Sequence, residues 1–482
     1  TLAIRKEYRY DPNGNLIYLS AGNTTIEWHY GPGNRLEWVL EAGAKTSYTY
    51  NRLGQLTAIT KPDGTLLIQE FDDASRLKRF YSSDQSVDYI LEYNSAGQIE
   101  RVHNLASGRS TSRVYSKEGR MVGETLENGL TIRFSYDCQG RKQEISLPDG
   151  SLIRHQYKNL FLTKVERCLA DGSLLYTHAY NAYNTQGNPL EQELICGSGT
   201  LLCSYDTEGR MLSTSAPFYE QKALYDTQGN VVKLNTKEGT NERSETFSYD
   251  AMNQLLPCNS TCTTEFDLNG NLTLKEEDGI RTQYYYDALN RLTEVKYNGN
   301  TIFECTYDAL HRRIQSKDRE GTRYYLYDGN NEIGSYNEQG LPLEIRILGR
   351  TTSAEGNATV AIEKDGNIYA ALHDLQGSIC GLIDISSKAL HSCSYTPYGK
   401  ASDAGSFASP WGYAGKRKDS ATGLIFYGRR YYDPSLCQWT TKDPLGFPDG
   451  AERRLFMQNN PLRYKDAYGL FSTEDTFEGI WA

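Results

Sequence analysis

The sequence has 482 residues and a formal net charge of −10 at pH 7. This acidic balance argues against a nucleic-acid partner, because proteins that bind nucleic acid carry basic stripes or patches. There is no run of 18 or more apolar residues, so no membrane-spanning helix is predicted. Apolar residues make up 38% of the chain and include 37 tyrosines, which leaves few aliphatic side chains for a thick core and favours a sheet with a polar face.

A seven-residue phrase recurs through the first two thirds of the chain. It consists of an aromatic residue, Asp or Asn, two variable residues, Gly, one further residue and an aliphatic residue, as in Tyr10-Asp11-Pro12-Asn13-Gly14-Asn15-Leu16. A period of about 21 residues sustained over many copies is typical of a repeat architecture. The aromatic residue stands at positions 10, 30, 50, 71, 93, 115, 136, 157, 183, 205, 225, 249, 266, 286, 307 and 327.

Each copy of the phrase predicts a strand, a turn and a second strand. The aromatic and aliphatic residues suit half-buried strand positions, Asp or Asn can bind the backbone that follows it, and Gly adopts positive φ without steric cost. Further turn signals lie between the copies: Pro62-Asp63-Gly64, Asn128-Gly129, Pro148-Asp149-Gly150, Asp171-Gly172, Asp278-Gly279 and Asn298-Gly299. The expected fold is therefore all-β, a long antiparallel ribbon of hairpins. Spacing alone leaves open a flat rod, a propeller or a coiled shell.

Past residue 330 the sequence carries a series of different motifs. In chain order they are Leu372-His373-Asp374-Leu375-Gln376-Gly377-Ser378, Tyr395-Thr396-Pro397-Tyr398-Gly399, Gly412-Tyr413-Ala414-Gly415-Lys416, Thr422-Gly423-Leu424-Ile425-Phe426-Tyr427-Gly428-Arg429-Arg430-Tyr431-Tyr432-Asp433-Pro434, Thr441-Lys442-Asp443-Pro444-Leu445-Gly446, Asn459-Asn460-Pro461 and Lys465-Asp466-Ala467-Tyr468-Gly469-Leu470. Together with the repeated phrase, this order resembles the Rhs family, with its YD repeats and Rhs-associated core domain. The resemblance covers essentially the whole chain. It predicts a YD-repeat β-shell at residues 1–330, a core domain at 331–470, and at 471–482 the start of a truncated variable C-terminal segment.

The resemblance implies a container. In the family the repeats coil into a hollow shell, the core closes one end, and the variable polypeptide after the core is a toxin held inside. The implied partners are the chain's own C-terminal toxin segment and, at the open end, a second shell or a secretion-system component. We expect a bacterial protein that is made in the cytoplasm and then secreted or displayed at the cell surface. Only twelve residues follow Leu470, so we expect either a piece of a longer protein or a core without its toxin.

The resemblance also implies that the core cuts its own chain after the last Gly-Leu, between Leu470 and Phe471. Asp443, Asp466 and Arg430 stand at the family's catalytic positions. Two carboxylates in one site do not easily both ionise, so one can keep a proton and donate it while the other activates water or attacks the peptide. The enzyme activity expected of these residues is at most that of a single-turnover aspartyl autoprotease, and the enzyme domain of the toxin is not expected within this chain.

An arginine beside this pair would hold one carboxylate charged or stabilise the developing oxyanion. The family usually has proline where this chain has Ala467, which predicts a looser turn at the cut, because proline fixes φ.

Simpler interpretations of the same residues remain open. Asp-Pro-x-Gly is an ordinary turn signature, and Arg430 could pair with a carboxylate at a strand end. His373 is expected to be structural, with its imidazole bound inside a hairpin. The ten cysteines have irregular spacings without a zinc-site pattern, so we expect reduced thiols, no metal and no cofactor.

At the level of function, one alternative is an extracellular adhesive or carbohydrate-binding YD-repeat protein without protease activity. Its exposed Tyr and Asn side chains would bind sugars, and saturable binding on a glycan array would favour this hypothesis. A third possibility is an inert shell that encloses no toxin and has an inactive cleavage site.

Overall fold

The computed structural model describes residues 6–21, 24–217, 219–249, 254–255, 262–349, 358–401, 409–447, 451–470 and 472–474. Within these residues the regular structure is β-strand and three short 3-10 turns, η1 (Ile195–Gly197), η2 (Tyr413–Gly415) and η3 (Met457–Asn459). No helix of the described chain is long and apolar enough to cross a membrane. The prediction of an all-β ribbon of antiparallel hairpins is confirmed.

The chain forms two compact units, each built from three segments. Unit 1 comprises residues 1–113, 261–312 and 440–454, and unit 2 comprises residues 114–260, 313–439 and 455–482. These units follow spatial contacts and divide the chain differently from the domains predicted at 1–330 and 331–470, which remain a prediction.

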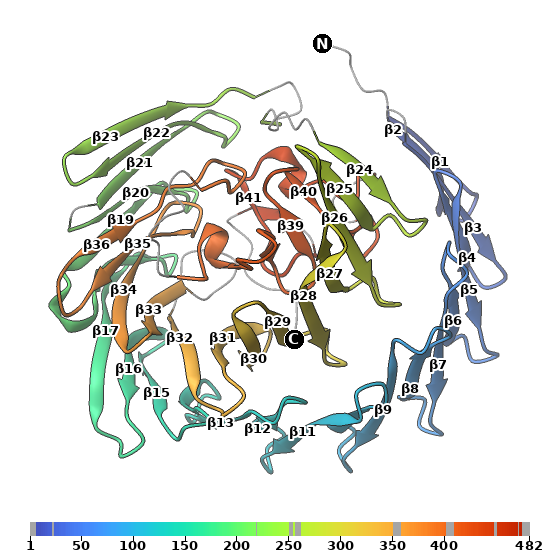
Figure 1. Ribbon diagram of the computed structural model, residues 1–482, viewed down its shortest axis with the longest axis horizontal. Coiled ribbons are helices and arrows are strands. Elements are labelled where there is room, and N and C mark those ends of the chain that lie inside the picture. The colour runs from blue at the N-terminus through green and yellow to red at the C-terminus, as the bar shows by residue number, and fades with distance from the viewer. Residues whose placement is uncertain are drawn as a thin grey trace. The chain divides into compact units, whose positions relative to one another are not determined.

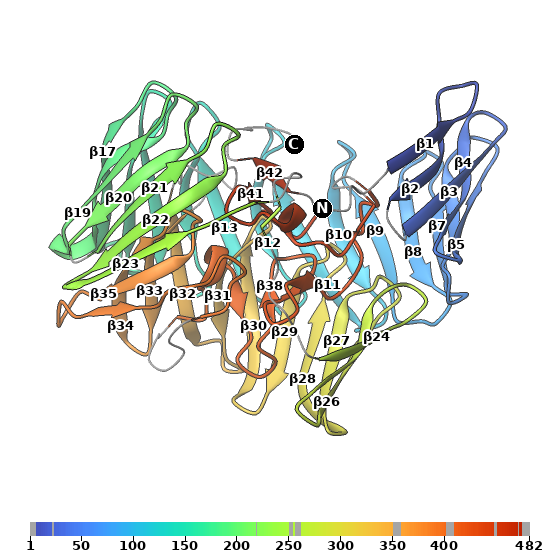
Figure 2. The ribbon, with the colours of Figure 1, turned by 90° about the horizontal axis from the view of Figure 1, so that it is seen from above.

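In unit 1 consecutive strands pair antiparallel within two runs, β1 to β11 and β24 to β28. The hairpins of β1 to β9 appear in blue in Figure 1, and those of β24 to β28 in yellow-green in Figure 2. The strands are β1 (Lys6–Tyr10), β2 (Leu16–Ala21), β3 (Thr24–Gly31), β4 (Arg35–Glu41), β5 (Ala44–Tyr50), β6 (Leu56–Thr60), β7 (Leu66–Phe71), β8 (Leu77–Ser82), β9 (Asp88–Tyr93), β10 (Ile99–Asn104), β11 (Arg109–Tyr115, which continues two residues into unit 2), β24 (Thr263–Phe266), β25 (Leu272–Glu277), β26 (Ile280–Tyr286), β27 (Leu292–Tyr297) and β28 (Asn300–Tyr307).

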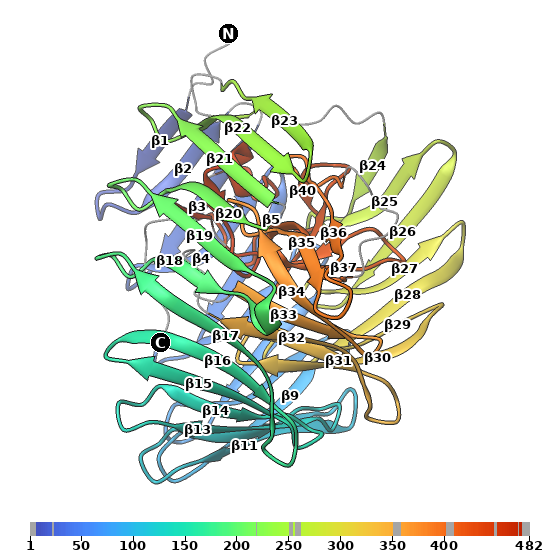
Figure 3. The same cartoon turned by 90° about the vertical axis from the view of Figure 1, so that its left-hand side faces the viewer.

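Unit 2 continues the same pattern and adds two small sheets. Figure 3 shows β19 to β23 beside β33 to β36 in this unit. The strands are β12 (Met121–Thr125), β13 (Thr131–Tyr136), β14 (Lys142–Ser146), β15 (Leu152–Lys158), β16 (Phe161–Cys168), β17 (Leu174–Tyr183), β18 (Pro189–Glu193), β19 (Thr200–Tyr205), β20 (Met211–Ala216), β21 (Tyr219–Tyr225), β22 (Val231–Glu238), β23 (Asn241–Thr246), β29 (Arg313–Asp318), β30 (Gly321–Asp328), β31 (Asn331–Tyr336), β32 (Pro342–Gly349), β33 (Ala358–Lys364), β34 (Asn367–His373), β35 (Ile379–Asp384), β36 (Leu390–Ser392), β37 (Arg417–Lys418), β38 (Ile425–Phe426), β39 (Tyr431–Asp433), β40 (Gln438–Trp439), β41 (Tyr464–Lys465) and β42 (Thr473–Glu474).

The turn predicted from the repeated phrase is present, and its chemistry is uniform. In the copy that starts at Tyr205, Asp206 Oδ1 accepts the backbone N–H groups of Glu208 and Arg210 at 3.0 and 2.8 Å, and Gly209 has φ of 84°. Arg210 Nε then donates to Asp206 Oδ2 at 2.6 Å. The same pair of backbone hydrogen bonds is made by Asp11, Asn51, Asp72, Asn94, Asp137, Asn184, Asp226, Asp287, Asp308, Asn337 and Asp374. The repeat therefore extends past residue 330, in two copies that were not predicted. Pro342 takes the aliphatic position in the copy at Asn337, and His373 takes the aromatic position in the copy at Asp374.

The repeat tyrosines also link successive hairpins through their hydroxyl groups. Tyr93 Oη donates to Leu77 O at 2.7 Å, and Tyr286 Oη donates to Leu272 O at 2.9 Å. In these bonds the acceptor lies 14 to 21 residues earlier, at or near the start of an earlier strand. The same bond is made by Tyr50, Tyr136, Tyr157, Tyr183, Tyr205, Tyr225, Tyr249, Tyr307 and Tyr327. This bond gives a physical reason for tyrosine, rather than phenylalanine, at these positions.

Each unit buries its own apolar clusters. Unit 1 has one around Leu67, Val87 and Val102 and another around Leu19, Ile26 and Val39. In unit 2 the largest cluster joins residues of β13 to β21 with residues of β30 to β35, so two layers of strands pack face to face there. A second cluster of unit 2 is aromatic, with the Tyr432 and Phe456 rings stacked 3.8 Å apart, and it supports the candidate site described below.

The burial of a repeat turn should decide how much that turn stabilises the protein. Asp308 and Arg312 form a turn ion pair of 2.8 Å with side chains 0% and 3% exposed, whereas Asp72 and Arg76 form the same pair with side chains 21% and 39% exposed. Asp308→Ala removes the carboxylate from this buried ion pair and should lower the free energy of unfolding by about 3–5 kcal/mol. Asp72→Ala, in the same unit, should have a much smaller effect because water replaces the lost partner. Urea denaturation of both variants tests this, and equal midpoint shifts would contradict it.

The expectation of reduced thiols is wrong for one cysteine. Cys437, in the aromatic cluster of unit 2, is disulfide-bonded, and its partner lies outside the described residues. Spacing along the chain does not show which distant cysteines meet in the fold, so this bond could not be predicted from spacing.

Candidate active site

The segment before the predicted cut, residues 466–470, is a short loop in unit 2. It follows β41, which pairs antiparallel with β42, with Tyr464 opposite Glu474 and Lys465 opposite Thr473. Phe471, the residue after the predicted cut, lies outside the described residues. Leu470, whose carbonyl group would be attacked, is described.

Asp466 organises this loop through one of its two carboxylate oxygens. Oδ1 accepts three backbone N–H groups, from Tyr468 at 3.1 Å, Gly469 at 2.7 Å and Leu470 at 3.0 Å. The side chain is only 2% exposed. Its other oxygen, Oδ2, is buried and accepts no hydrogen bond from the described chain. Oδ2 is therefore the oxygen that can take part in proton transfer.

Arg430 contacts both Asp466 and the predicted cut. Its Nη2 lies 3.5 Å from Asp466 Oδ2 and donates to Leu470 O at 3.2 Å, while Nε donates to Gly469 O at 2.6 Å. The guanidinium lies over the Trp439 ring, 4.3 Å from its centroid, and Arg430 is buried. A charged donor already placed on the Leu470 carbonyl oxygen is what an oxyanion-stabilising group requires.

Burial gives Asp466 an unusual protonation equilibrium. Desolvation raises the pKa of this carboxyl to about 6 from its ordinary value of 3.8, although Arg430 and the three backbone N–H groups favour the ionised form. A carboxyl with a pKa near 6 can both hold and release a proton close to neutral pH, which suits general acid–base chemistry.

Close backbone packing holds the loop against the segment that carries Arg430. The Arg429 N–H donates to Tyr468 O at 2.9 Å. Gly469 has φ of 71°, and a Cβ there would lie 3.2 Å from the Arg430 nitrogen, so a larger residue would push the two segments apart. Lys416 Nζ donates to Ala467 O at 2.7 Å. Lys416 was not predicted as a site residue, although it ends one of the quoted motifs.

Asp443, the other predicted catalytic carboxylate, belongs to unit 1. It is buried and forms the Asp-Pro-x-Gly turn that its sequence predicts, with Oδ1 accepting the Leu445 N–H at 2.8 Å and its carbonyl accepting the Gly446 N–H at 3.2 Å. Arg453 Nη2 also donates to Asp443 O, at 2.6 Å. The pairing of Asp443 with Asp466 stays a prediction, whereas Arg430, Asp466 and Leu470 are brought together within unit 2.

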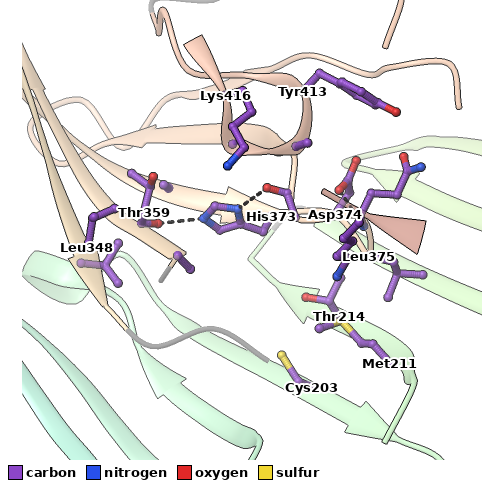
Figure 4. A pocket seen from close by; sticks show the side chains of 18 of the residues that line it. Cys203, Met211, Thr214, Leu348, Thr359, His373, Asp374, Leu375, Tyr413 and Lys416 are labelled. Atoms are coloured by element: carbon purple, nitrogen blue, oxygen red, sulfur yellow. Dashed lines mark hydrogen bonds between the residues drawn. The ribbon is translucent and has the colours of Figure 1, made fainter. Parts of the chain in front are cut away.

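A cavity of about 100 Å³ in unit 2 is lined by Asp466 together with His373, Asp374 and Lys416. Figure 4 shows His373 between two backbone carbonyls, with Nδ1 3.2 Å from Gly377 O and Nε2 2.8 Å from Thr359 O. These contacts confirm the predicted structural role of His373. A cavity of this size has room for a few water molecules beside the Asp466 carboxyl.

The sequence model of the Teneurin YD-shell family matches residues 42–160 and 181–468. The chain belongs to this family. The match covers most of the chain, and it runs through the strands of both units and through Arg430, Asp443 and Asp466.

YD-shell relatives include bacterial toxins and animal proteins. The chain is 24% identical to Double-stranded DNA deaminase toxin A of Burkholderia cenocepacia over 83% of its own length and 30% of that protein. It is 23% identical to Teneurin-3 of Danio rerio over 94% of its length and 20% of the relative, and 22% identical to Toxin subunit YenC1 of Yersinia entomophaga over 91% and 48%. The chain thus spans less than half the length of these relatives.

The same fold occurs in solved structures. The crystal structure of TcdB2-TccC3 superposes with a TM-score of 0.75 at 17% sequence identity, covering 96% of this chain and 30% of the TcdB2-TccC3 chain. At this identity the likeness concerns the fold.

Proposed function

We propose that this chain is the shell of a bacterial Rhs-type toxin, which encloses a C-terminal polypeptide and frees it inside the shell by cutting the chain after Leu470. The observation that carries the proposal is the position of Arg430, whose guanidinium donates to Leu470 O and lies 3.5 Å from the unbound oxygen of Asp466. The chain belongs to a family whose relatives include bacterial toxins, and this supports the proposal that the enclosed C-terminal polypeptide is a toxin.

The proposed reaction is hydrolysis of the Leu470–Phe471 peptide bond. Water attacks the Leu470 carbonyl carbon and loses a proton to one carboxylate of the Asp443–Asp466 pair. The carbonyl electron pair moves onto the oxygen, where Arg430 stabilises the negative charge. The proton held by the other carboxyl passes to the Phe471 nitrogen, the C–N bond breaks, and a Leu470 carboxylate and a Phe471 amine remain. One chain performs this reaction once.

Enclosure can be tested separately from the cut. The purified full chain is passed over a size-exclusion column in native buffer and again in denaturant, and the eluted species are weighed by mass spectrometry. An enclosed product should elute with residues 1–470 in native buffer and separate from them in denaturant. A product that separates from the shell already in native buffer would contradict enclosure.

The pH dependence of the cleavage rate should reflect the protonation of the Asp466 carboxyl. Burial raises its pKa to about 6, so the neutral form is favoured below pH 6 and the ionised form above it. The cleavage rate should therefore change slope near pH 6. A rate that rises as the pH falls assigns Asp466 as the acid, and a rate that falls assigns it as the base.

Asp374 provides the control for this measurement. Burial also raises the pKa of Asp374 to about 6, and this residue lines the same cavity. The inflection should persist in Asp374→Asn. A flat profile between pH 5 and 7 in the wild type, or an inflection that disappears in Asp374→Asn, would contradict the assignment to Asp466.

A further inference from the structure

The four carbonyl groups before the predicted cut are all held by hydrogen bonds. Those of Tyr468, Gly469 and Leu470 are bound by the backbone or side chains of Arg429 and Arg430. The fourth, Ala467 O, is bound by Lys416 Nζ at 2.7 Å. Lys416 therefore completes the set from a separate segment of the chain.

The hydrogen bond from Lys416 restrains Ala467 more than any single bond restrains the next three residues, because Ala467 has fewer hydrogen bonds. Its own N–H donates to no acceptor in the described chain, while the next three residues are fixed by N–H bonds to Asp466 Oδ1. Alanine leaves φ free to rotate, whereas a proline at this position would fix φ near −65°. The Lys416 ammonium is thus the restraint on the residue that joins Asp466 to the rest of the loop.

Lys416 is itself well placed for this task. It follows the η2 turn, where Ala414 and Gly415 have φ of 50° and 65°, and its N–H donates to Tyr413 O at 3.0 Å. Its Nζ lies 5.7 and 5.9 Å from the ring centroids of Tyr427 and Tyr468, within the range of a cation–π contact. Tyr468 belongs to the loop, so the ammonium contacts the loop at two successive residues.

We propose that Lys416 is a positioning residue for self-cleavage, whose ammonium fixes Ala467 and thereby sets the path of the chain from Asp466 to the Leu470 carbonyl. This inference rests on the proposed function. It assigns to Lys416 the restraint that proline would provide at position 467.

The test compares cleavage rates of the full chain in Lys416→Met, Ala467→Pro and the double variant. Loss of a hydrogen bond from a charged group should slow the cut of Lys416→Met about tenfold. Proline removes no hydrogen bond at Ala467 and supplies the missing restraint, so the double variant should cut at the rate of Ala467→Pro alone. Lys418→Met is the matched control, because Lys418 is exposed two residues further along the same segment, and it should cut at the wild-type rate.

A second measurement does not depend on cutting. Amide hydrogen exchange of residues 466–470 should be faster in Lys416→Met and return to the wild-type rate in the double variant. Unchanged exchange in Lys416→Met, or slow cleavage that Ala467→Pro does not restore, would overturn the role of Lys416. A wild-type chain that never cuts would refute the proposed function, while the exchange rates would still decide whether Lys416 holds the loop.

Discussion

Replacing Asp466 with asparagine should leave the chain uncut. The amide keeps the size of the side chain and an oxygen that can accept the N–H groups of the loop, but it can neither hold nor release the proton that Oδ2 exchanges. General acid–base groups contribute about 10²–10⁴-fold to rate, so a chain that cuts within minutes would need hours to days. The measurement is the fraction of intact chain over time, by mass spectrometry of the whole protein.

Asp206→Asn is the control for this variant. Asp206 also caps a loop through Oδ1 and pairs with an arginine through Oδ2, and it too lies in unit 2, but in a repeat turn that the proposed reaction does not involve. It should cut at the wild-type rate. Equal cleavage rates for Asp466→Asn and the wild type would show that Asp466 takes no part in the reaction.

Replacing Arg430 with lysine should slow the cut by about 10²–10³-fold, the usual effect of losing one oxyanion-stabilising donor. The charge is kept, but an ammonium cannot reproduce the planar fork that binds the carbonyl oxygens of Gly469 and Leu470 and also faces Asp466. Single-turnover cleavage kinetics in the full chain give the rate ratio directly.

Arg429→Lys is the matched control for Arg430→Lys. Arg429 contacts the same loop through its backbone N–H, which the substitution keeps. Its side chain donates instead to Asn330 Oδ1, at 3.4 Å. Wild-type cleavage in Arg429→Lys and slow cleavage in Arg430→Lys would show that the Arg430 guanidinium is required, whereas equal slowing would indicate only a disturbed backbone in this segment.

Most of the ribbon could be predicted from the sequence because its chemistry is local. The phrase around Asp206 places the turn acid, its i+4 partner Arg210 and the glycine of positive φ within five residues, so spacing alone defines the turn. The tyrosine hydroxyl bonds join residues of successive strands, and spacing alone did not show them. The preference for 37 tyrosines over 14 phenylalanines was the signal that could have revealed them.

Only part of the site could be predicted from the sequence, and the physical reason for each success or failure differs from residue to residue. Arg430 and Asp466 were identified by the resemblance. The structure adds the hydrogen bond from Arg430 to Leu470 O, which no sequence motif could show. Lys416 binds a carbonyl 51 positions further along the chain, and such a contact depends on the path of the backbone through the core rather than on spacing. The pairing of Asp443 with Asp466 remains a prediction from the resemblance.

Self-cleavage between Leu470 and Phe471 can be detected directly at the new N-terminus that it creates. Purified wild-type chain, incubated without any other protease, is digested for terminal-amine sequencing in parallel with Asp466→Asn. We expect a new N-terminus at Phe471 in the wild type and none in the variant. A wild-type chain that stays intact, or a new N-terminus at Phe471 that forms equally in Asp466→Asn, would contradict it.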